Sequence, residues 1–271
     1  MSLIDNFRNA WKIIKDAFSL LGKDKDLLVP LVVVLLINLG LFALAVVFFI
    51  LASPFGTIGL YIIAFVFLLL TLFVSTFFSA ALTWMVYEVY NGKDTHFGKG
   101  MRIAFKNIFD IILYTIVTFL ISLVVGALRS KDDNQNFIVI LLKNIFASII
   151  EKAWDILRHF ILPSMILSEN SFGQAFKEIP KLKNNIPETL VGGFAFDLIL
   201  GPIHFIEFLI CFVIGFLISL ISVFGGIAVG VGLFVLLLIL TNMVYQYVKV
   251  SYFTILYIEL KKKLKEPLLR I

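Results

Sequence analysis

The chain lacks most of the groups on which soluble enzymes and secreted proteins depend. It has a single cysteine, Cys211, so an intrachain disulfide framework is excluded. Only 15% of its residues are charged, against roughly 25% in soluble globular domains. The sequence also contains no H-E-x-x-H motif, no G-x-S-x-G motif, no Walker-type glycine loop and no zinc-binding cysteine pair. We therefore expect no enzyme, no cofactor and no metal site.

Long apolar runs make up most of the chain. Hydrophobic residues account for 61% of it and the mean hydropathy is +1.03, a composition that indicates lipid as the solvent. A membrane-spanning helix needs roughly 20 predominantly apolar residues. Six segments meet this requirement: 27–51, 58–90, 108–128, 145–167, 190–222 and 226–258. We predict an all-α polytopic membrane protein, a single domain over residues 1–271 with six transmembrane helices arranged as three hairpins.

The basic residues are distributed unevenly between the connecting segments. Nearly all of them lie in the N-terminus, residues 91–107, residues 168–189 and the tail, whereas the opposite side has only Arg129, Lys131 and Lys143. By the positive-inside rule this pattern predicts a multi-pass protein of the cell membrane with both termini in the cytoplasm. Topology thus accounts for the net charge of +5, and we expect no nucleic-acid partner. The partners we expect are membrane lipids, including those with anionic headgroups. Whether the protein also forms a homo-oligomer is left open by the sequence.

A repeated unit precedes each predicted hairpin. Phe97–Arg102 resembles Phe172–Lys177, and each stretch is short, basic and amphipathic. A looser N-terminal copy places hydrophobic residues at helical spacing between basic ones: Phe7, Trp11, Ile14 and Phe18. We predict a cytoplasmic surface helix before every hairpin. The resulting units are a surface helix at 1–22, a hairpin at 27–90, a surface helix plus hairpin at 97–167 and again at 172–258, and a basic cytoplasmic tail at 259–271.

Several stretches resemble an uncharacterised family of prokaryotic six-helix integral membrane proteins, known only as a domain of unknown function. They are Trp11, Asp24–Pro30, Phe77–Leu82, Trp154 ahead of Pro163, and Gln174–Lys177. The resemblance implies a fold and a membrane location, and no known activity. The chain departs from the family in a longer spacing from Pro163 to Glu169 and in the dense charge of Glu151–His159. A weaker similarity, to CysZ-type sulfate permeases, lies in the N-terminal helix, the length and the cytoplasmic helices, but no anion-site motif of those proteins can be placed here.

Charged and polar residues interrupt the last three apolar segments. In the fourth and in the fifth they recur at helical spacing and so share one face of each helix. Measured from the cytoplasmic ends at 1.5 Å per residue, their depths predict three pairs between the two helices: Arg158–Asp197, Asp155–His204 and Lys152–Glu207. The candidate residues are Glu151, Lys152, Asp155, Arg158, Asp197, His204 and Glu207, with Asn242, Gln246 and Lys249 of the sixth segment closing the cluster.

Helix-breaking residues lie beside these charges, namely Pro163, Gly201 and Pro202. Broken helices in membranes often mark substrate sites, although proline kinks that only shape the packing are commoner. Gly226 and Gly230, four residues apart, favour close approach of two helices.

Two functions are open from the sequence. The first is a channel or transporter for an ion or a small polar solute, with a path between the fourth, fifth and sixth helices, because ionisable residues inside a membrane often mark function. In that case neutralising His204 and Glu207 together is expected to abolish flux. The alternative is a non-transporting membrane scaffold whose intramembrane charges are structural salt bridges that fix helix register.

Overall fold

The computed structural model describes residues 3–52, 56–130, 137–180, 186–265 and 268, with side chains for all of these except 3–7, 52, 137 and 186–199. The protein is 92% helical and its described residues form no strand. The elements in chain order are α1 (Leu3–Lys23), the 3-10 helix η1 (Lys25–Leu28), α2 (Val29–Ala52), α3 (Gly56–Tyr90), α4 (Phe97–Lys106), α5 (Ile108–Arg129), α6 (Phe137–Leu167), α7 (Phe172–Glu178), α8 (Ile186–Ser219) and α9 (Val223–Leu264).

A helix lies at each place where the sequence predicts one. The expected surface helices correspond to α1, α4 and α7, and the six long apolar segments to α2, α3, α5, α6, α8 and α9. The largest difference at a C-terminus is in α9, which continues past Ile258 to Leu264. Its last turn holds Lys261–Lys263, and cations stabilise a helix C-terminus by interacting with the helix dipole.

Five of the long helices are apolar enough to cross a membrane over lengths of 20 to 42 residues. The described stretches are Lys25–Leu51, Gly56–Tyr90, Ile108–Arg129, Leu200–Ser219 and Val223–Leu264. The sixth predicted span, α6, is also long enough at 31 residues, but it contains too many charged residues to count as one of these apolar spans. An all-helical membrane protein is thus supported, whereas a layout of six crossing helices stays a prediction.

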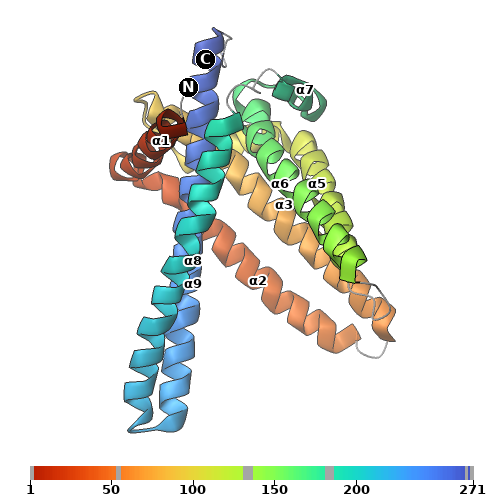
Figure 1. Cartoon of the computed structure of the whole chain (residues 1–271), viewed down its shortest axis with the longest axis vertical. Helices are drawn as coiled ribbons and strands as arrows, with labels where there is room; N and C mark the ends of the chain where they lie inside the picture. Colours follow the sequence, from red (N-terminus) through yellow and green to blue (C-terminus); the bar gives the residue numbers. More distant parts are fainter. Residues whose placement is uncertain (1–2, 53–55, 131–136, 181–185, 266–267, 269–271) are drawn as a thin grey trace.

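The hydrophobic core lies at the end of the molecule that holds both termini (Figure 1). Most of its large, fully buried side chains come from α1, α3, α6 and α9, for example Leu20, Met85, Ile166 and Tyr252. Away from this core, three pairs of sequence neighbours pack together, α2 with α3, α5 with α6 and α8 with α9. The α8–α9 pair diverges from the other helices (Figure 1), and the long helices expose apolar side chains such as Phe42 and Phe216. Such surfaces are suited to lipid contact.

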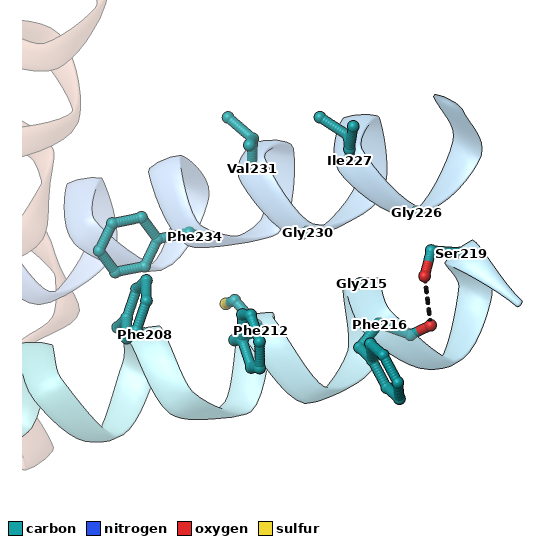
Figure 2. A pocket seen from close by; sticks show the side chains of 11 residues that line it. Phe208, Phe212, Gly215, Phe216, Ser219, Gly226, Ile227, Gly230, Val231 and Phe234 are labelled. Carbon is teal, nitrogen blue, oxygen red and sulfur yellow. Dashed lines mark hydrogen bonds between the residues drawn. The ribbon is translucent and has the colours of Figure 1, made fainter. Parts of the chain in front are cut away.

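Three glycines bring α8 and α9 into close contact. A Cβ atom added at Gly226 would lie 2.4 Å from the carbonyl oxygen of Gly215, and one at Gly230 would lie 3.2 Å from the Gly215 Cα. Figure 2 shows these glycines where the two ribbons approach each other, with Phe208, Phe212 and Phe216 along α8. The predicted close approach at Gly226 and Gly230 is confirmed, and its partner is Gly215.

Candidate functional site: polar cavities along α9

Most of the charged residues predicted on α6 line one cavity. This first cavity has a volume of about 480 Å³ and lies between α5, α6 and α9. Helix α6 contributes Glu151, Lys152, Asp155 and Arg158, and α9 contributes Lys249. The α5 wall was not foreseen from the sequence. Its polar members are Thr118, Ser122 and Arg129.

Ion pairs run inward along the first cavity from exposed to buried residues. At the open end, the Arg129 guanidinium donates to Glu151, and about half of the Glu151 side chain, 49%, is exposed. Deeper in, Arg158 donates to Asp155, which also lies 3.8 Å from Lys249 Nζ. The Lys249 side chain is only 11% exposed. The Asp155 carboxylate therefore faces both Arg158 and Lys249.

His159 lies beside Asp155 and lines an adjoining cavity rather than the first one. Its ring stacks on Phe253 with the centroids 4.0 Å apart, and its Nδ1 lies 3.9 Å from Asp155 Oδ1 and also contacts the Asp155 carbonyl oxygen. The Tyr114 hydroxyl donates to the Arg158 carbonyl oxygen at 3.5 Å. The position of the charged side chains is thus fixed by packing from α5 and α9 as well as by their mutual attraction.

Two further cavities continue from the first along α9, and the third is lined mainly by apolar side chains. The second, about 190 Å³, shares Arg158 and Lys249 with the first and is also lined by Gln246 and by hydroxyl groups of α3. The third, about 370 Å³, shares Gln246, Ser75 and Ser79 with the second and adds Asn38 and Asn242. Each cavity is therefore lined by part of the stripe predicted on the sixth apolar segment: Lys249 in the first, Gln246 and Lys249 in the second, and Asn242 and Gln246 in the third.

The depth of these residues follows from the length of α9. At 1.5 Å per residue, Asn242 lies about 28 Å and Lys249 about 39 Å from Val223, where the helix begins. The hydrocarbon core of a bilayer is about 30 Å thick. If α9 stands close to upright, Lys249 reaches the polar boundary on the side of the termini, where a charge costs far less than at mid-membrane.

Two of the three predicted pairs between α6 and α8 are wrong. Among the described side chains, Asp155 pairs with Arg158, His159 and Lys249 rather than with His204. Glu207 accepts hydrogen bonds from His204, at 2.9 Å, and from Thr241, rather than from Lys152. The third pair, Arg158–Asp197, includes a side chain outside the described residues.

The reason is the position of α8. It packs along α9 and against α1, whereas α6 packs mainly on α3, α5, α7 and α9 and makes few contacts with α8. The predicted cleft between the fourth, fifth and sixth helices is accordingly replaced by a cavity between the third, fourth and sixth. His204 and Glu207 form a separate polar site with Thr241, roughly 20 Å along α8 from Ser219.

The predicted helix breaks do not interrupt the backbone. Helix α6 continues through Pro163 and α8 continues through Gly201 and Pro202. A proline inside a helix removes one backbone hydrogen bond, a loss that long helices accommodate by bending. Pro163 is one of the residues that line the second cavity, so it still contributes to the site.

A buried polar cluster outside the cavities was missed by the sequence reasoning. The Glu178 carboxylate of α7 accepts hydrogen bonds from Ser164 of α6 at 2.6 Å, from Tyr257 of α9 at 3.1 Å, and from Lys261. Glu178 and Lys261 are 8% and 3% exposed. The sequence gives no signal for this cluster, because an acid in a short amphipathic helix normally indicates a solvated face. Among the described residues, no three His, Cys, Asp or Glu side chains converge as a metal site would require.

Comparison with known protein families assigns the chain to one of them. Residues 57–262 match DUF6159, a family of unknown function. The chain belongs to DUF6159. The DUF6159 match spans α3 to the last turns of α9 and so includes most of the cavity residues, whereas Asn38 of α2 lies before it. No curated protein and no solved structure matches this DUF6159 chain, so these comparisons do not support the similarity to CysZ-type sulfate permeases.

Proposed function

We propose that this protein is a channel or transporter for an ion or a small polar solute, and that the solute path follows the polar stripe of α9. The observation that carries the proposal is the run of three cavities along α9, each of which is lined by at least one of Asn242, Gln246 and Lys249. A row of polar side chains beside cavities in an otherwise apolar protein is the arrangement by which membrane proteins replace the hydration of a solute.

The proposal includes the membrane topology. We place six spans in the membrane, with α6 as the charged one, and both termini in the cytoplasm. The position of the two termini at one end of the molecule supports this topology (Figure 1), as does the basic C-terminal turn of α9. We further propose that the protein is not an enzyme, and that its partners are lipids and, in one version, a second copy of itself.

The cavity charges have separate tasks in this proposal. Asp155 balances Arg158 and Lys249 in the resting protein. An entering anion would compete with Asp155 for the two basic side chains, and an entering cation would compete with them for Asp155. Gln246 and Asn242 carry no charge, so they can hydrogen-bond a solute without trapping it. The paired charges would select which solute enters, and the amide side chains would line the path along which it moves.

Flux through purified protein in liposomes tests the proposal. The probes are potassium, chloride, protons and glycerol, each compared with empty liposomes. We expect at least one to pass, and we expect Gln246→Leu and Lys249→Gln each to reduce its flux at least tenfold. Lys263→Gln, which removes an equal charge from an exposed residue, is expected to leave flux unchanged.

The scaffold alternative is favoured by one observation. The described carboxylates of the site are all in ion pairs or hydrogen bonds with neighbouring side chains, as Glu151, Asp155 and Glu207 show. A scaffold requires that none of the probes passes and that Lys249→Gln lowers thermal stability without any effect on permeability. That pair of results would replace the transport proposal.

A further inference from the structure

A large apolar groove lies between α1, α8 and α9, away from the polar cavities. Its volume is about 640 Å³. Helix α1 supplies Trp11, Ile14, Lys15 and Phe18, while the other two helices supply almost only aliphatic and aromatic side chains. The groove thus has an apolar floor and one cationic residue at its α1 side.

The outward face of α1 combines basic and aromatic residues. Arg8, Trp11, Lys12, Lys15 and Phe18 are all exposed and recur at helical spacing. Trp11 is 46% and Phe18 50% exposed, and Lys15 Nζ lies 5.9 Å from the centre of the Trp11 ring. The acidic side chain that the structure describes on α1, Asp16, is half-buried. This outward face is therefore cationic.

The groove lies at the level of a membrane boundary. Its α9 wall includes Val244, about 31 Å from Val223, and its α8 wall includes Leu200, about 28 Å from Ser219. These lengths match the thickness of the hydrocarbon core, about 30 Å. Exposed tryptophan and lysine side chains are favoured at this boundary, where phosphate groups meet acyl chains.

We infer that this groove binds one anionic phospholipid of the adjacent leaflet. An acyl chain lies in the apolar groove beside Val244, and the phosphate lies at Lys15 with the cationic face of α1 around it. Each basic residue close to an anionic lipid surface contributes about 1 kcal/mol of attraction. The site goes beyond the proposed transport function, since it shares none of the polar stripe of α9.

Quenching of tryptophan fluorescence by brominated lipid tests this inference. Of the three tryptophans, Trp84 and Trp154 are 3% and 8% exposed, so bromine on an acyl chain reports mainly on Trp11. The full-length protein is placed in phosphatidylcholine vesicles containing a small, equal fraction of dibrominated phosphatidylglycerol or dibrominated phosphatidylcholine. We expect stronger quenching by the phosphatidylglycerol, and Trp11→Phe removes most of the signal.

Two charge variants separate a site from general attraction. Lys15→Gln is expected to weaken the preference for phosphatidylglycerol about fivefold, the equivalent of about 1 kcal/mol. Lys23→Gln removes the same charge from an exposed residue of the same helix outside the groove and should keep the preference. Equal quenching by both lipids, or an equal loss in both variants, would overturn the inference.

A third variant tests the groove itself. Val244→Phe narrows it without a change of charge and is expected to lower quenching by both brominated lipids. Unchanged quenching would place the acyl chain in the bulk bilayer and reject the site. Neither result depends on solute flux, so the inference and the transport proposal can fail separately.

Discussion

Glu178 shows how this protein holds a buried charge. The carboxylate joins α7 to the end of α6 through Ser164 and to α9 through Tyr257 and Lys261. Asn170 adds a further hydrogen bond at 3.1 Å. Burial by itself raises the pKa of Glu178, but the hydrogen bonds from Lys261 and Ser164 outweigh it and hold the pKa below its ordinary value.

The stability of the protein should therefore depend on this one acid. Because the pKa is lower in the folded protein than in the unfolded chain, Glu178 stabilises the fold above the unfolded pKa of about 4.3, and this contribution is lost as the pH falls through the folded value. We expect Glu178→Gln to cost about 2 kcal/mol at pH 7 and to flatten the loss of stability below about pH 4.5. Thermal unfolding in detergent across this pH range measures both effects.

The exposed pair Lys106–Glu169 gives the control. The Glu169 side chain is 45% exposed, and exposed pairs contribute under about 1 kcal/mol. The Glu169→Gln variant should lose stability at low pH to the same extent as we expect for the unmodified protein. Parallel pH profiles for Glu178→Gln and the unmodified protein would contradict the account of Glu178.

Residues that resemble the family have identifiable structural tasks. The Asp24 side chain accepts from the backbone N–H of Thr95 at 3.3 Å and so ties the start of α2 to the segment before α4. Gln174 forms a capping box with Ser171 at the start of α7. A Cβ atom at Gly100 would lie 2.8 Å from the Ala81 carbonyl oxygen, which explains the small residues in that stretch of α3. These tasks are structural, so the resemblance points to the fold and not to an activity.

At the scale of elements, the α8–α9 contact depends on side-chain size at single positions. Gly226 has no room for a Cβ atom, whereas Gly232 on the same helix has nothing within 4 Å of that position. We expect Gly226→Ala to destabilise the protein by about 2 kcal/mol through overpacking, and Gly232→Ala to leave it within about 0.5 kcal/mol or slightly more stable. Thermal unfolding of the two variants side by side makes the comparison, and equal midpoints would contradict the close approach.

The helices themselves could be predicted from the sequence, but the arrangement of their polar faces could not. The length of an apolar run indicates where a helix begins and ends, which is why α3 and α5 lie almost where expected. The pairing of Asp155 with Lys249 instead of His204 depends on which helix packs beside α6. Periodicity gives the face of a helix and says nothing about its neighbour. The α5 wall with Arg129 was missed for the same reason.

At the scale of the whole molecule, the core and the buried cluster at Glu178 join all three helix pairs at one end, and the α8–α9 pair diverges from the other helices toward the opposite end (Figure 1). Ion pairs such as Lys99–Glu88 and Lys261–Glu178 lie at the joined end, whereas Arg129–Glu151 lies at the other end of α5. The polar stripe of α9 runs from the joined end into the space between the pairs. A solute path along this stripe requires that water reach Gln246 and Asn242.

Access of a membrane-impermeant, charged thiol reagent to cysteines placed on α9 tests this requirement most directly. The native Cys211 is only 2% exposed and gives little background. In intact liposomes we predict fast labelling of Gln246→Cys and Asn242→Cys, and almost none of Val235→Cys, whose apolar side chain is exposed on the same helix. Labelling of Gln246→Cys and Asn242→Cys no faster than that of Val235→Cys would mean a dry stripe and would contradict a polar path along α9.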